Sequence, residues 1–142
     1  MKSIERKINL LLERLARLRF IADELKSFVD YEKSMDKKDI VERGIQISIE
    51  TCLDIGKIII SGKGLPEPKD NKGIFVVLAQ AGLISDESLN FLVPMAGARN
   101  VLVHGYDKVD DALIYGVLKN HLNDFDRFIT EVQQAFLSDA GG

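Results

Sequence analysis

The stretch Gly97-Ala98-Arg99-Asn100-Val101-Leu102-Val103-His104-Gly105-Tyr106 sets an arginine, an asparagine and a histidine into an otherwise apolar run, with a tyrosine just beyond it. An apolar run of this kind is typical of the inner helix of a helical bundle. Burying polar side chains there costs free energy unless a partner or a chemical role compensates. We therefore interpret this stretch as a functional site and the remaining sequence as its scaffold.

The scaffold is predicted to be helical. Apolar residues recur at alternating spacings of three and four, which predicts long amphipathic helices over residues 3–31 and 108–137. Residues 36–61 predict a third long helix, whose apolar residues cover more than one face and whose small residues allow close packing. A short helix over residues 72–80 follows a loop rich in proline and glycine, and the motif ends a helix over residues 85–104.

Capping and breaking residues locate several helix ends. Ser85 is a typical residue for the start of the motif helix, and Gly105 is expected to end that helix. Asp107 is expected to cap the last helix, with Asp110 three residues later as the acid of a capping box. Pro94 lies inside the motif helix and is expected to kink it or to mark a local restart.

The pattern of elements indicates an all-α protein. The chain of 142 residues is long enough for one core, and it contains no internal repeat, low-complexity segment or convincing strand. We expect a bundle of about five helices, in which neighbouring long helices are antiparallel. The bundle is expected to occupy residues 1–137 as a single domain, and residues 138–142 are expected to fray as a C-terminal tail.

Composition excludes some classes of function. The net charge of -3 argues against a tight, sequence-independent nucleic-acid binder, but not against an enzyme that touches only a few phosphates. With a single cysteine, no intramolecular disulfide can form, which fits a cytoplasmic location. No signal peptide is apparent and the apolar runs are too short to span a membrane, so we expect no membrane partner.

No familiar metal or nucleotide motif is present. The sequence lacks a His-Glu-x-x-His pair, a Cys-x-x-Cys pair, a phosphate-binding glycine loop and a Gly-x-Ser-x-Gly elbow, so we expect neither metal nor cofactor. Glu50 and Asp54 stand four residues apart and share a helix face. They are interpreted as a metal site, as support for a catalytic group or, preferably, as carboxylates that face neighbouring cations or a helix N-terminus.

Four side chains of the motif share one sector of the helix. At about 100° per residue, Arg99 lies at 0°, Asn100 at 100°, His104 near 140° and Tyr106 near -20°. Val101 and Leu102 are expected to point the other way. A sector that wide is typical of the floor of a groove, and a complete site would then need a second copy of the motif across a dimer axis.

These side chains suit cleavage of an RNA phosphodiester without metal. Histidine moves protons near neutral pH, arginine grips phosphate with two parallel hydrogen bonds, and asparagine orients the imidazole or binds an anionic oxygen. A 2′-hydroxyl attacks the adjacent phosphate while the arginine stabilises the developing charge. From spacing alone, however, the commoner explanation for Arg99 and His104 is a pair of satisfied structural groups in a helix interface.

A family resemblance changes that balance. Residues 99–106 resemble the Arg-x-x-x-x-His-x-Tyr motif of the HEPN superfamily, specifically the HepT-like toxins, including the polar residue directly after the arginine. Residues 47–55 are similar to the second helix of that family. The loop over residues 65–68 and the turn over residues 81–84 also resemble the family, so the likeness extends over most of the chain.

The resemblance implies a HEPN-like bundle that is a homodimeric, metal-independent ribonuclease, the toxin of a type II toxin–antitoxin pair. Arg99, Asn100 and His104 would be catalytic, and Asp54 is a possible supporting residue. The usual partner is a minimal nucleotidyltransferase antitoxin, which can transfer AMP to the motif tyrosine, here Tyr106. AMP would add bulk and negative charge to the phosphate-binding cleft. Gly105 makes the corner that carries Tyr106 flexible in principle.

Two other functions stay open at this point. The acidic net charge also suits a non-catalytic helical module that binds nucleotide and docks a nucleotidyltransferase. The third possibility is a purely structural helical dimer in which the motif side chains are buried and paired.

The remaining candidates are interpreted as structural. His121 is expected at the surface of the final helix, Cys52 in the core, and Tyr31 and Tyr115 in packing or rim positions. Three arginines cluster on the first helix: Arg14, Arg17 and Arg19. They are interpreted as a solvated face with helical ion pairs, and a patch that steers phosphates is the alternative.

Overall fold

The computed structural model describes the backbone of residues 2–141 and the side chains of residues 2–105 and 107–136. This part of the chain is helical and contains no strand. The helices are α1 (Lys2–Glu24), α2 (Phe28–Lys33), α3 (Met35–Lys63), α4 (Asn71–Gln80), α5 (Asp86–His104), α6 (Asp111–Asn120) and α7 (Leu122–Gly141), with a 3₁₀ turn η1 (Tyr106–Lys108). The all-α fold class is confirmed.

The two expected end helices are each broken, which corrects the count of about five helices. Residues 3–31 form α1 and α2, because the Ser27 side chain accepts a hydrogen bond from the Asp30 N–H and starts a new helix. Lys119 braces this joint by donating from Nζ to the carbonyl oxygens of Ala22 and Leu25. Residues 108–137 divide at His121, where the backbone leaves α6 before α7 begins.

The ends of the motif helix are as predicted, but the start of the next helix is not. The Ser85 side chain accepts from Ser88 N–H, and Gly105 N–H donates to the Val101 carbonyl at 2.8 Å. Asp110, rather than Asp107, caps α6, because its Oδ1 accepts from the first N–H groups of that helix. Asp107 lies in η1. Pro94 lies on the exposed side of α5, which continues through it without a restart.

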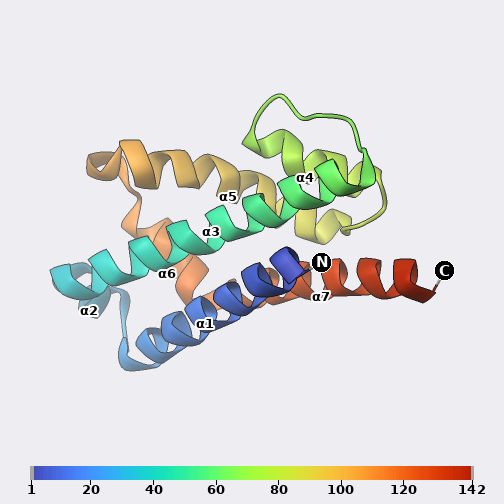
Figure 1. Ribbon diagram of the computed structural model, residues 1–142. Helices are drawn as coiled ribbons and strands as arrows, with labels where there is room; N and C mark the ends of the chain where they lie inside the picture. The colour runs from blue at the N-terminus through green and yellow to red at the C-terminus, as the bar shows by residue number, and fades with distance from the viewer. Residues whose placement is uncertain (1, 142) are drawn as a thin grey trace.

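Helix α3 is the central element of the bundle. It packs against α1, α4 and α5, and in Figure 1 it crosses the molecule between α5 on one side and α1 on the other, antiparallel to both. Small residues allow the close contacts, as predicted. A Cβ at Gly44 would lie 2.7 Å from Leu18 Cδ2, and one at Gly56 would lie 2.5 Å from Ile74 Cγ2.

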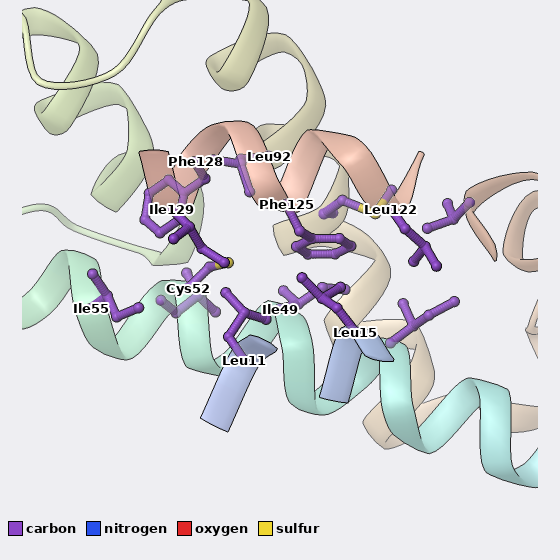
Figure 2. Packing of buried hydrophobic residues seen from close by; sticks show 14 of the residues in the cluster. Leu11, Leu15, Ile49, Cys52, Ile55, Leu92, Leu122, Phe125, Phe128 and Ile129 are labelled. Carbon is purple, nitrogen blue, oxygen red and sulfur yellow. The ribbon is translucent and has the colours of Figure 1, made fainter. Parts of the chain in front are cut away.

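The core draws on helices that are far apart in sequence. In Figure 2, Leu11 and Leu15 of α1 point toward Ile49 of α3 and toward Phe125 of α7. Cys52 is fully buried in the same cluster, which confirms its core position. The packing of α1, α3 and α7 in this core fixes the orientation of α3. It thereby determines which side chains of α3 face the motif helix.

Helix α7 continues through Gly141, and Gly142 lies outside the described residues. The fraying of residues 138–142 and the domain boundary at residue 137 stay predictions. Among the described residues, no helix combines the length and the apolar composition needed to cross a membrane.

Candidate functional site

The arginine of the motif is held by a carboxylate from the central helix. Nε and Nη2 of Arg99 each lie 3.0 Å from Oε2 of Glu50, which is on α3. Both side chains are about one-third exposed, so the pair lies at the protein surface with its inner edge against the bundle. Glu50 therefore fixes the direction of the guanidinium and offsets much of its charge.

Asn100 lies beside the outer edge of this guanidinium. Its Oδ1 accepts from Nη1 of Arg99 at 3.4 Å, a long contact between exposed groups. The hydrogen bond between Asn100 and Arg99 can therefore be replaced by one to a ligand at little cost in free energy. Nη1 of Arg99 lies on the exposed side of the guanidinium, where a ligand can reach it. The edge with Nε and Nη2 is therefore held by Glu50, and the edge with Nη1 is accessible to a ligand.

The two α3 carboxylates that the sequence singled out have different partners. The favoured ion-pair interpretation is confirmed for both, because Asp54 Oδ2 lies 3.1 Å from Nζ of Lys7 on α1 while Glu50 binds Arg99. Asp54, proposed as the supporting residue, faces α1 and has no contact with the motif side chains among the described interactions. The i,i+4 spacing of the two carboxylates was the signal, and only the packing of α3 shows which one faces α5.

The motif is not buried in an inner helix, which corrects the starting expectation. Asn100 and His104 are exposed, and Arg99 is partly exposed. Leu102 packs in the core, but Val101, expected to point inward with it, is 39% exposed. The C-terminal half of α5 lies at the rim of the bundle, so only one side of it meets the core. The motif therefore presents an open surface in a single copy of the chain.

Tyr106 lies beyond the end of the helix that carries the other three motif residues. Helix α5 ends at His104, and Gly105 has φ -135° and ψ 45°, so the chain turns before Tyr106 begins η1. The angle of -20° expected for Tyr106 assumed a continuous helix, but α5 ends before this residue. Its side chain lies outside those that the structure describes. The shared sector contains Arg99, Asn100 and His104.

Within the described residues, no group of three or more His, Cys, Asp or Glu side chains is arranged to hold a metal ion. A cavity of about 660 Å³ lies beneath the loop between α3 and α4, lined in part by Lys57, Leu65, Pro68 and Asn71. It includes none of the motif residues, so the candidate site is a surface and not this cavity.

The remaining sequence candidates are structural, as predicted. Tyr31 is fully buried and its ring packs against that of Tyr115, with centroids 5.5 Å apart. His121 is at the surface, 2.9 Å from Asp124 Oδ2, although it lies between α6 and α7 and not within the last helix. Burial raises the pKa of the Cys52 thiol, so this cysteine is unsuited to nucleophilic attack.

One of the three clustered arginines of α1, Arg19, pairs with side chains of α7. Arg19 forms an ion pair with Asp126 of α7 and donates to Asn123 Oδ1 at 3.1 Å. Arg14 is partly buried, and Arg17 is exposed. The interpretation as a solvated face with ion pairs is confirmed for Arg19, which is committed to α7 and not to a phosphate.

Comparison with known proteins places these observations in a family. A family profile described as "Ribonuclease HepT-like" matches residues 11–132. The chain is 30% identical to a protein named mRNA nuclease HepT from Shewanella oneidensis, over 72% of this chain and 77% of that protein. It is 25% identical to a protein named tRNA nuclease HepT from Aphanizomenon flos-aquae, over 82% of each chain.

A solved structure agrees with the sequence comparisons. The fold superposes with a TM-score of 0.84 on the tri-AMPylated HEPN toxin of Shewanella oneidensis in complex with an MNT antitoxin. The match covers 92% of this chain and 96% of that one, at 27% identity. The similarity therefore spans the whole bundle, including the helix that carries the arginine and histidine.

Proposed function

The chain belongs to the HepT-like ribonuclease family of the HEPN superfamily, and on that premise we propose that it cleaves RNA without metal at Arg99 and His104. It is a ribonuclease toxin that a nucleotidyltransferase partner inhibits. The observation that carries the assignment of the site is that α5 presents both the partly exposed Arg99, whose guanidinium is held by Glu50, and the exposed His104.

The chemistry follows from the groups that face solvent. The 2′-hydroxyl of one nucleotide attacks its own 3′-phosphate and the bond to the next 5′-oxygen breaks, which leaves a 2′,3′-cyclic phosphate and a 5′-hydroxyl. His104 takes or gives the proton in these steps. Arg99 stabilises the additional negative charge on the phosphate oxygens, and Asn100 binds one of those oxygens or the imidazole.

The site is completed by a second copy of the chain. Arg99, Asn100 and His104 form an open surface in one copy, and Val101 adds an exposed apolar side chain to the same part of α5. An open surface does not exclude water or surround a phosphate, whereas two such surfaces facing each other across a two-fold axis form a cleft with two sets of groups.

The partner that regulates this site is a minimal nucleotidyltransferase antitoxin. Tyr106 follows the end of α5 directly, on the turn after His104, so AMP attached there lies next to the proposed catalytic residues. A negatively charged adenylate competes with RNA for Arg99. This arrangement is supported by the AMPylated relative. A cytoplasmic location is part of the proposal, and the free thiol of Cys52 fits a reducing compartment.

Cleavage of RNA in EDTA tests this proposal. The wild-type protein should cleave several unrelated RNAs in the chelator, and Arg99→Ala and His104→Ala should each lower the rate by about 10²- to 10⁴-fold. Arg99→Lys is the matched control for charge, because lysine keeps the charge and lacks the planar fork. Equal rates for wild type and both alanine variants would contradict the proposal.

A further inference from the structure

The first turn of α4 contacts the motif helix at a glycine. A Cβ built at Gly97 would lie 3.4 Å from Cε and 3.7 Å from Nζ of Lys72. The end of the lysine side chain therefore lies next to the α5 backbone at Gly97, which has no side chain. The Lys72 ammonium group is at the surface of that helix. Lys72 itself is exposed, so this position is open to a ligand from solvent.

Gly97 faces the same direction as Asn100 and His104 of the proposed site, and not the direction of Arg99. At 100° per residue, it lies about 60° from Asn100 and about 20° from His104 around the helix axis. Along the axis it precedes His104 by seven residues, or about 10 Å. The Lys72 ammonium therefore extends the surface of Asn100 and His104 by two helical turns.

This lysine differs electrostatically from the motif arginine. Glu50 offsets the charge of Arg99, whereas no ion pair of the described residues involves Lys72. The lysine also stands in the first turn of α4, where a cation is unfavourable because it opposes the helix dipole. Neither an ion pair nor helix stability explains the residue, while a chain of net charge -3 needs local cations to attract RNA.

We propose that Lys72 binds a phosphate of the RNA substrate next to the scissile one, and that Gly97 leaves room for the end of Lys72 to lie close to α5. The inference rests on the proposed ribonuclease function. Every nucleotide of a strand carries one charge, so a cation two turns from His104 meets a phosphate other than the one that is cleaved. Lys72 thereby contributes to the binding of RNA and to its direction across the site, and not to the chemical step.

Binding of fluorescent 2′-O-methyl RNA tests the proposal, since this RNA keeps every phosphate but has no free 2′-hydroxyl to react. Lys72→Ala should weaken binding about fivefold near 0.1 M salt and lower the slope of log affinity against log salt by about 0.7. Lys72→Arg should retain most of the affinity. Lys26→Ala, which removes an exposed lysine at the joint of α1 and α2, should match the wild type.

A second variant separates the placement of Lys72 from its charge. Gly97→Leu should weaken binding as Lys72→Ala does, and the double variant should be no weaker than either single one. Thermal unfolding and light scattering check that each variant keeps its fold and its oligomeric state. A Lys72→Ala protein that binds RNA with wild-type affinity and salt slope overturns the inference while the ribonuclease assignment stands. Absence of both RNA binding and cleavage in the wild type overturns the two together.

Discussion

At the scale of single residues, the Arg99 guanidinium is held along one edge and accessible along the other. Glu50 binds Nε and Nη2, which leaves Nη1 beside the exposed Asn100. A guanidinium held in this way keeps its orientation before substrate arrives, so less side-chain entropy is lost on binding. The arrangement makes Glu50 a positioning residue for the proposed reaction, although it touches no substrate itself.

Glu50→Gln tests this positioning role. The amide keeps the shape of the side chain but loses its charge, so the guanidinium is held less firmly, and we expect the cleavage rate to fall about tenfold. KM should change less than kcat if orientation in the transition state is what is lost. Asp54→Asn is the matched control on the same helix face, since Asp54 pairs with Lys7 and should leave cleavage unchanged. Equal effects from both variants would argue for a general loss of stability instead.

A second carboxylate of α3 is predicted to destabilise the fold near neutral pH. Burial raises the pKa of Glu42, nearby Asp111 raises it further, and Lys38 acts in the opposite direction. A carboxyl whose pKa is higher in the folded state favours folding while it is protonated, and this contribution is lost as the pH rises through the folded-state pKa.

Glu42→Gln should therefore stabilise the protein more at pH 7 than at pH 4, because glutamine stays neutral at both values. Urea unfolding of both proteins at the two pH values measures the difference in free energy of unfolding. A difference that is the same at both values, or larger at pH 4, would contradict the assignment of a raised pKa.

Among the helices, local sequence predicted the elements better than their boundaries. Ser85 and Gly105 limit the motif helix as expected, since both act through hydrogen bonds within one turn. The breaks near Ser27 and at His121 were missed because the apolar spacing continues across them. Val29 continues the spacing after Leu25 but is 50% exposed, and Tyr31 is buried in its place, so the buried face shifts at the first break. Leu118 and Leu122 are four residues apart and both buried, so the spacing keeps its phase across the second break.

Asp110→Ala tests the capping assignment at the start of α6. Loss of the side-chain acceptor should cost about 1 kcal/mol of stability. Asp107→Ala removes the residue that the sequence predicted as the cap. This variant should change the free energy of unfolding much less, because Asp107 lies in η1. Urea denaturation of the two variants decides between the two capping residues. A larger loss of stability from Asp107→Ala than from Asp110→Ala would show that Asp107 is the cap, as the sequence predicted.

For the molecule as a whole, the residues proposed for the site could be chosen from the sequence, whereas their surroundings could not. Arg99, Asn100 and His104 share a helix sector, which follows from spacing alone. Their exposure and the choice of Glu50 over Asp54 depend on how α3 and α5 pack, and no local pattern encodes that contact. Lys72 was missed for the same reason, since it is distant in sequence from the glycine that it covers.

The dimer proposal can be tested by placing a charge on the motif surface. Val101→Glu should set like charges against each other across the two-fold axis, so the protein becomes monomeric and loses cleavage. Val29→Glu is the control, because Val29 is also an exposed valine but lies on α2, away from α5. Light scattering gives the mass and an RNA assay gives the activity. A monomeric Val101→Glu protein with full activity would show that one copy of the motif is sufficient.

Cleavage through the 2′-hydroxyl is the claim on which the whole account depends. An RNA that the wild type cleaves at a known position is resynthesised with a single 2′-deoxynucleotide on the 5′ side of that bond, and both substrates are incubated in EDTA. We predict that cleavage at that bond disappears with the deoxy substrate, and that the unmodified RNA yields a 2′,3′-cyclic phosphate and a 5′-hydroxyl. Cleavage of the deoxy substrate at the same bond and rate, with 5′-phosphate products, would contradict the proposed roles of Arg99 and His104.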